Sequence, residues 1–191
     1  MGHSKIENLP PEEIEKRSFE IITEELIKRG IRLPKGEELI TKRVIHTSAD
    51  FDYAETLCYS KGAVEILKEL IKNGADIVTD TNMVLAGINK KALAKFGGEA
   101  HCFMADEEIA LLAKQRNVTR AAVSMEKAAA IKKPVIFAIG NAPTALIKLY
   151  EMAEMREKRN GNRPLSLVFR WDLSMWKRQR NLYWERIFHI S

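Results

Sequence analysis

Three short apolar runs, each set among helical patterns, most constrain the fold of this chain. The runs are ADIVTD, EAHCFM and KPVIFAIG, at residues 75–80, 99–104 and 133–140. Apolar runs of this length that alternate with helices are typical of buried strands in a parallel sheet. The sequence therefore predicts an α/β layer fold with a mainly parallel sheet.

Helical spacing of apolar residues, with start and stop signals, predicts the elements around these runs. The first expected helix starts at a pair of prolines and stops at Gly30. Residues 35–46 begin with acids and end with bases, as the helix dipole favours, although their Val and Ile residues leave a strand open. The expected helices cover residues 10–30, 35–46, 60–74, 90–98, 106–117, 119–131 and 141–158.

The bulk composition fits a soluble globular protein, and we expect one domain over residues 1–191. No apolar run approaches the roughly 20 residues that a membrane span needs, and the N-terminus has no apolar leader. Cys58 and Cys102 are far apart, which fits a reducing cytosol better than a disulfide framework or a zinc site. We therefore expect a cytoplasmic protein with no membrane partner.

The net charge of +5 would ordinarily suggest a nucleic-acid partner. Residues 156–191 hold nine Lys or Arg and three Asp or Glu, so the remainder of the chain carries −1. Aromatic residues among the basic ones resemble single-strand binders, but no nucleic-acid-binding module is recognisable. We therefore expect no nucleic-acid partner.

Polar residues follow two of the expected strands, at the sheet edge where α/β proteins bind ligands. Asp80, Thr81 and Asn82 could bind polar edges of a ligand, or could form a local Asx turn. Asn141 and Ala142 precede a helix whose free N–H groups suit an anion such as a carboxylate. The same turn also serves as a helix cap without any ligand.

His46 is the strongest candidate for chemistry. It ends an expected helix, where the dipole stabilises the imidazolium form, and this suits a proton donor. Arg120 begins another helix, where its charge opposes the dipole, so we expect a partner that is either a ligand carboxylate or an internal acid. His101, inside an expected strand, is better interpreted as a core residue, and Ser18 alone as a surface serine.

Several function classes lack their sequence motifs. No HxH, HExxH or His/Cys cluster supports a protein-bound metal. The chain has neither the GxxxxGK[ST] nor the GxGxxG pattern of nucleotide sites, and no GxSxG pattern of hydrolases. From residue patterns alone, the expectation is an α/β domain with a polar cleft and one poised histidine.

Six longer segments identify a resemblance. They are RSFEII, RVIHTSADFDYA, GAVEI, TDTNMVLAGI, TRAAVSME and AIGNAPTALIKLYEM, in this order. Together they resemble the precorrin-8X methylmutase family, which includes cobalt-precorrin-8 methylmutases of cobalamin biosynthesis. The resemblance covers about residues 10–155, and IHTSADFD and IGNAPTAL are its most specific parts.

The resemblance implies a three-layer, flavodoxin-like α/β/α fold and a homodimer. It also implies an isomerase that moves a methyl group from C-11 to C-12 of precorrin-8, or of its cobalt form, to give hydrogenobyrinic or cobyrinic acid. His46 matches the histidine of the family motif, which implies a proton donor. Such a shift needs a placed proton and a shaped pocket. We therefore expect no cofactor and no protein-bound metal, with any cobalt carried by the substrate.

The resemblance also suggests what the other candidates bind, because a corrinoid carries many carboxylates that suit arginine and helix N-termini. Met83 could line an apolar ring face, although core packing is equally compatible. The expected substrate-binding residues are Ser18, Arg43, Thr47, Asp80, Thr81, Asn82, Met83, Arg120, Asn141 and Ala142. The alternative function is a tetrapyrrole-binding carrier without turnover.

Residues 162–191 form an atypical tail, because the resemblance breaks after EMAEMREK. The family pattern continues there with a strand and a helix, whereas this tail holds all three tryptophans and the excess of basic residues. Read one base earlier, the codons of Trp171, Trp176 and Trp184 force Gly, Glu and Gly in turn. The other codons permit PALVIGVPVGFVNVEEAKELILGKDIPYI, which fits the pattern.

We predict that the tail is an out-of-frame reading of the family's C-terminal part, so that this chain lacks the family's last strand and helix. In that case the tail is poorly ordered or packs differently from the family. A genuinely divergent tail is the alternative. Resequencing the gene tests the prediction, and a coding sequence whose earlier frame does not encode that string would contradict it.

Overall fold

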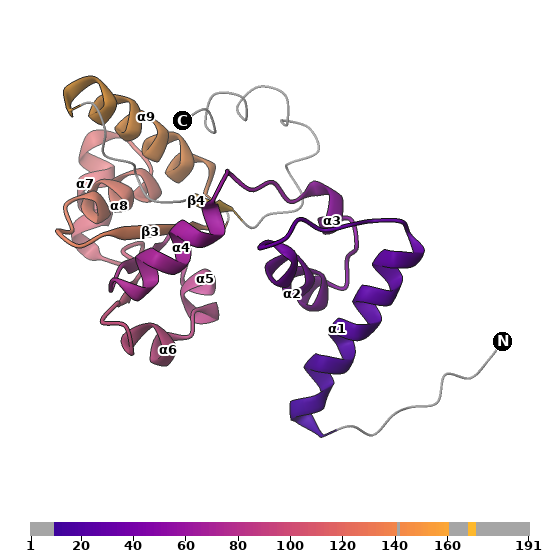
Figure 1. Cartoon of the computed structure of the whole chain (residues 1–191). Coiled ribbons are helices and arrows are strands. Elements are labelled where there is room, and N and C mark those ends of the chain that lie inside the picture. The colour runs from indigo at the N-terminus through magenta and orange to yellow at the C-terminus, as the bar shows by residue number, and fades with distance from the viewer. Residues whose placement is uncertain (1–9, 141, 161–167, 171–191) are drawn as a thin grey trace. The chain divides into compact units, whose positions relative to one another are not determined.

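The computed structural model describes residues 10–140, 142–160 and 168–170. The chain divides into two compact units, the first ending at Val64 and the second beginning at Glu65. Figure 1 labels the helices and strands of both units. The expectation of one domain over residues 1–191 stays a prediction.

The first unit is helical. Its elements are α1 (Pro11–Lys28), α2 (Glu38–Ser48) and α3 (Tyr53–Thr56). A small core of Ile22, Leu26 and Ile45 joins α1 to α2. The start and stop signals of the first helix are confirmed, with Pro in its first turn and Gly30 at a positive φ of 71° just after it. Residues 35–46, for which a strand was left open, are mostly helical.

The second unit contains a parallel sheet, as predicted. Its strands are β1 (Asp76–Thr79), β2 (Ala100–His101), β3 (Val135–Ile139) and β4 (Val168–Arg170). They lie in the order β2-β1-β3-β4, and every pairing is parallel. The carboxyl ends of β1 and β3, from which the predicted ligand-binding residues follow, are therefore neighbours on one edge of the sheet.

Helices cover both faces of this sheet. They are α4 (Ala63–Lys72), α5 (Asn82–Gly87), α6 (Lys90–Ala94), α7 (Glu107–Arg116), α8 (Arg120–Ala129) and α9 (Pro143–Asn160). Figure 1 shows α7, α8 and α9 on one side of β3, and α4, α5 and α6 on the other. The predicted three-layer α/β/α fold is confirmed. Among the described helices, none combines the length and apolar character needed to cross a membrane.

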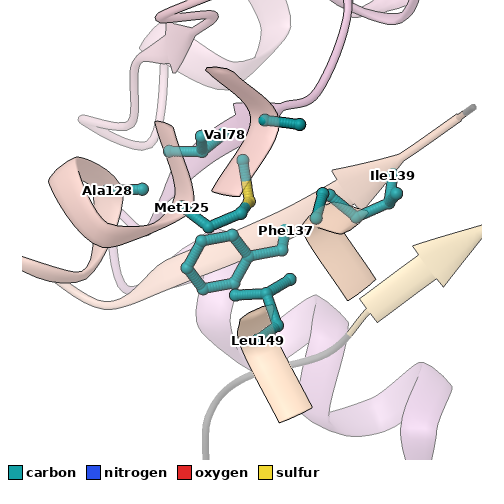
Figure 2. Close-up of a cluster of buried hydrophobic side chains, with 8 residues drawn as sticks. Val78, Met125, Ala128, Phe137, Ile139 and Leu149 are labelled. Atoms are coloured by element: carbon teal, nitrogen blue, oxygen red, sulfur yellow. The ribbon is translucent and has the colours of Figure 1, made fainter. Parts of the chain in front are cut away.

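The main core lies between β1, β3, α8 and α9. Figure 2 shows Met125 and Leu149 packed against opposite sides of the Phe137 ring, with Val78 and Ile139 beside them. Phe137 and Ile139 share a sheet face because side chains alternate along a strand. Burying each large apolar side chain here contributes about 1.5–3 kcal/mol, so this cluster fixes α8 and α9 on the sheet.

Three details differ from the sequence-based expectation. The strand expected over residues 99–104 is wrong in extent, because only Ala100 and His101 pair with β1. Beyond them the chain turns, with the Asp106 N–H donating to the Phe103 carbonyl at 3.1 Å. The short helices α3 and α5 were not predicted, since four and six residues are too few for clear helical periodicity.

Three residues of the atypical tail form β4. Val168 pairs with Phe137, and Arg170 pairs with Ile139. The rest of residues 162–191 lies outside the described part of the chain. The out-of-frame interpretation of the tail stays a prediction.

We predict that Met125→Ala lowers the free energy of unfolding by about 2–5 kcal/mol, because it leaves a cavity beside Phe137. Met125 has no exposed surface. Met155→Ala is the matched control, since this helical methionine is 59% exposed and its loss is expected to cost within about 0.5 kcal/mol. Urea unfolding of both variants measures the difference, and equal losses would contradict the assigned core.

Candidate functional site

The helices α1 and α2 bring Ser18 and His46 together. His46 lies in the last turn of α2, and its Nδ1 is 2.7 Å from the Ser18 hydroxyl oxygen. When the hydroxyl donates this hydrogen bond, the proton of the neutral ring lies on Nε2. When the ring is an imidazolium, Nδ1–H donates to the same oxygen. Ser18 can therefore satisfy Nδ1 in both protonation states, with Nε2 left for another partner.

Phe19 orients the imidazole of His46 from the neighbouring position on α1. The two ring centroids are 5.9 Å apart in an edge-on arrangement. His46 is exposed, so this contact and the Ser18 hydrogen bond restrain a ring that solvent can still reach. Phe19 was not predicted as a site residue. Its place directly after Ser18 in RSFEII was the available signal.

Arg43 and Thr47, both predicted to bind substrate, have partners within the first unit. The guanidinium of Arg43 pairs with the Glu15 carboxylate and lies over the Phe19 ring, 5.5 Å from its centroid. The Thr47 hydroxyl donates to the Arg43 carbonyl at 2.6 Å. Glu15 was not predicted, although its spacing of four from Phe19 places both on one helix face.

In the second unit, Asp80 links the end of β1 to the start of α9. Its carboxylate accepts the Gly140 N–H at 2.8 Å and the Ala142 N–H at 2.7 Å. The side chain has no exposed surface. This differs from the expectation that Asp80 faces a ligand and that the Ala142 N–H is open to a substrate carboxylate, because the two predicted groups bind each other. Asn141 lies outside the described residues.

The residues after Asp80 begin α5. Thr81 caps this helix, its hydroxyl oxygen accepting the Val84 N–H at 3.3 Å. Asn82 and Met83 form the exposed first turn. Met83 is 86% exposed, so the core-packing alternative for it is excluded, whereas a ligand contact stays a prediction.

Arg120, the first residue of α8, keeps its charge available. Its side chain is exposed, and within the described part of the chain we find no acid paired with it. It borders a surface hollow of about 450 Å³ that Lys114, Asn117 and Val118 also line. Of the two partners expected for Arg120, the internal acid is therefore not seen among these residues.

The starts of α8 and α9 are joined directly. The Thr119 hydroxyl donates to the Thr144 hydroxyl at 2.9 Å and accepts the Ala122 N–H at 3.2 Å, which caps α8. Further along, Lys148 of α9 lies 3.1 Å from Glu151 and 3.2 Å from Glu126 of α8. Hydrogen bonds to Glu151 and Glu126 raise the pKa of Lys148 above its usual value. Thr119 thus ties the start of α8, whose first residue is Arg120, to the start of α9.

His101 is a packed residue rather than part of a cluster of ligands. Its ring stacks on Phe103 with centroids 5.7 Å apart, and its Nε2 lies 3.8 Å from Asp76. Across the residues that the structure describes, no group of three or more His, Cys, Asp or Glu could hold a metal ion.

Comparison with known proteins identifies a matching family and several similar proteins. The family model described as precorrin-8X methylmutase matches residues 13–161, a stretch that runs through both compact units. The cobalt-precorrin-8 methylmutase of Priestia megaterium is 40% identical over 152 residues, which are 79% of this chain and 66% of that protein. The protein of the same name from Salmonella typhimurium is 41% identical over 145 residues, 74% of this chain and 69% of its own length.

A solved structure matches as well. The crystal structure of precorrin-8x methyl mutase from Thermus thermophilus superimposes with a TM-score of 0.67 at 33% identity, over 82% of this chain and 72% of that one. The chain therefore spans about two thirds of the length of the relatives that it matches.

Proposed function

The chain belongs to the precorrin-8X methylmutase family, and we propose that it is an isomerase that moves a methyl group from C-11 to C-12 of precorrin-8 or of its cobalt form. The relatives named cobalt-precorrin-8 methylmutase, at 40% and 41% identity, support this reaction class. The product in this proposal is hydrogenobyrinic acid, or cobyrinic acid when the substrate carries cobalt.

The observation that carries the mechanism is the pair of Ser18 and His46, 2.7 Å apart. In our proposal Nε2 of His46 donates a proton to the macrocycle, which draws electron density toward that position and lowers the barrier to methyl migration. Nδ1–H then donates to the Ser18 oxygen. Because substrate and product are isomers, the proton returns to Nε2, and no electron or second reactant is consumed. General acid catalysis of this kind is worth about 10²–10⁴-fold in rate.

Substrate binding in this proposal relies on Arg120, which is exposed and has no acid paired with it among the described residues. A corrinoid carboxylate would form charge-assisted hydrogen bonds with its guanidinium. The exposed Asn82 and Met83 offer an amide and an apolar surface for the polar substituents and the ring. The remaining predicted contacts, from Ser18, Arg43, Thr47, Thr81 and Asn141, belong to the same proposal.

We further propose that the protein acts without a resident cofactor, as a homodimer in the cytosol. An intramolecular methyl shift calls for neither redox nor group-transfer chemistry, and any cobalt is part of the substrate. Two exposed apolar residues on one face of α1, Ile14 and Ile21, offer a surface that a second copy could cover. Cys58 and Cys102 are both free, which is compatible with a reducing compartment.

We predict that His46→Ala folds and binds corrinoid product but loses about 10²–10⁴-fold in kcat, because the proton donor is gone. The absorbance change of precorrin-8 and of its cobalt form measures turnover, and chromatography identifies the isomeric product. His101→Ala, which removes a histidine packed on Phe103, is the control. Wild-type turnover by His46→Ala would rule out the proton-donor role. A wild-type protein that shifts the substrate's absorbance without converting it would support the carrier alternative.

We predict that Arg120→Ala weakens product binding by about 1.5–3 kcal/mol, the typical value of a charge-assisted hydrogen bond, with little change in thermal stability. Arg116→Ala is the matched control, because this exposed arginine on α7 already pairs with Glu126 at 2.7 Å. Calorimetric titration with product and thermal melting measure the two effects. A loss of stability with unchanged binding would make Arg120 a structural residue.

A further inference from the structure

We propose that Asp80 is a positioning residue that holds Arg120 in place for substrate binding, through the start of α9. This inference rests on the proposed function, in which Arg120 binds a substrate carboxylate. It replaces the expectation that Asp80 contacts the substrate itself.

The first step is the link between β1 and α9. The buried Asp80 carboxylate accepts the N–H groups of Gly140 and Ala142 at 2.8 and 2.7 Å. Gly140 follows β3 directly, and Ala142 directly precedes α9, an 18-residue helix whose N-terminal dipole favours a nearby negative charge. The internal carboxylate thus joins the end of β1 to the segment that leads into α9. Asp80 acts on the fold at this edge, and its lack of exposed surface keeps it from a ligand.

Gly140 allows this link to form. A Cβ atom built on Gly140 would overlap Cγ2 of Val84, and would lie 3.6 Å from the Asp80 carboxylate. Only a residue without a side chain brings the end of β3 this close to the start of α5. The contact between Gly140 and Val84 and the hydrogen bonds of Asp80 therefore hold the ends of β1 and β3 tightly together.

The second step leads from α9 to Arg120. Two residues beyond Ala142, the Thr144 hydroxyl accepts the hydrogen bond of Thr119 at 2.9 Å. Thr119 is the N-cap of α8, whose first residue is Arg120. A shift at the start of α9 would thus move the cap of α8 and the backbone that carries the guanidinium.

Asp76 provides a matched control on the same strand. It lies at the opposite end of β1, is 5% exposed, and accepts the Glu99 N–H at 2.9 Å. Its carboxylate also lies 3.3 Å from Lys133. Both aspartates are buried and bind a backbone N–H of a neighbouring segment, but only Asp80 lies at the edge that leads to Arg120.

The test compares Asp80→Asn with Asp76→Asn in the full chain. An asparagine at position 80 turns an NH₂ group toward the Gly140 or the Ala142 N–H, so that hydrogen bond is lost. We expect both variants to lower Tm by several degrees. Asp80→Asn should weaken product binding and raise KM by about tenfold with kcat nearly unchanged, whereas Asp76→Asn should leave binding within about twofold.

A double-mutant cycle asks whether Asp80 acts through Arg120. If it does, Asp80→Asn in an Arg120→Ala background weakens product binding by less than about twofold further, because the positioned group is already gone. Fully additive losses would overturn the inference, as would equal losses of affinity in Asp80→Asn and Asp76→Asn. Faster hydrogen exchange of the Gly140 and Ala142 amides in Asp80→Asn is expected, and unchanged exchange would also overturn it.

Thr144→Val keeps the test decisive if Asp80→Asn does not fold. It removes the hydroxyl that accepts the Thr119 hydrogen bond while preserving the side chain's shape, and Thr144 is only partly buried. We expect stability close to wild type and an affinity loss of several-fold, and unchanged affinity would overturn the link to α8. Failure of the proposed function is distinguishable, because the wild-type protein itself would then fail to convert the corrinoid, whether or not it binds it.

Discussion

The carboxyl edge of the second unit depends on one buried charge. Asp80 leaves β1 and binds two backbone N–H groups of the chain that leaves β3, so two strand ends share one carboxylate. A buried carboxylate is costly unless it is well hydrogen-bonded. Here the backbone donors and the dipole of α9 offset that cost. The hydrogen bonds at this edge are thereby already formed within the protein, which lowers the ordering cost of binding any ligand there.

In each unit, the predicted site residues divide into those that bind other groups of the fold and those that keep a polar group available. The Arg43 guanidinium pairs with Glu15, and the Thr47 hydroxyl binds the backbone of its own helix. His46 keeps Nε2 available, and Arg120 keeps its charge available among the described residues. The internal pairs thus account for Arg43 and Thr47, whereas His46 and Arg120 remain the groups on which the proposed function depends.

The sequence predicts β1 and β3 well because most of their residues are buried. Apolar runs such as KPVIFAIG identify β3 with few alternatives, and Gly30 marks the end of α1 through its positive φ. The short length of the two-residue β2 and the presence of the six-residue α5 could not be predicted. Elements this short are set by tertiary contacts, such as the hydrogen bond from Thr79 to the carbonyl of His101, rather than by periodicity.

The candidate site was less predictable, because a residue type does not reveal which way its side chain faces. Asp80 and Ala142 each suit a ligand by type and position, yet they bind each other. Ser18 had no assigned role from its surroundings in the sequence, and its partner His46 is 28 positions away. Only the family resemblance predicted that both residues belong to a site. It could do so because the family's fold packs α1 against α2.

The topology also bears on the atypical tail. A right-handed crossover through α9 brings the next strand beside β3 and parallel to it, which is where Val168–Arg170 pairs. A parallel strand covered by helices on both faces is normally a near-continuous apolar run. Arg170, paired with Ile139, departs from that rule, whereas PALVIGVPVGFV, a string that the earlier frame permits, would satisfy it. Residues 168–170 thus lie where the topology places the next strand, and the out-of-frame interpretation predicts a more apolar strand at the same position.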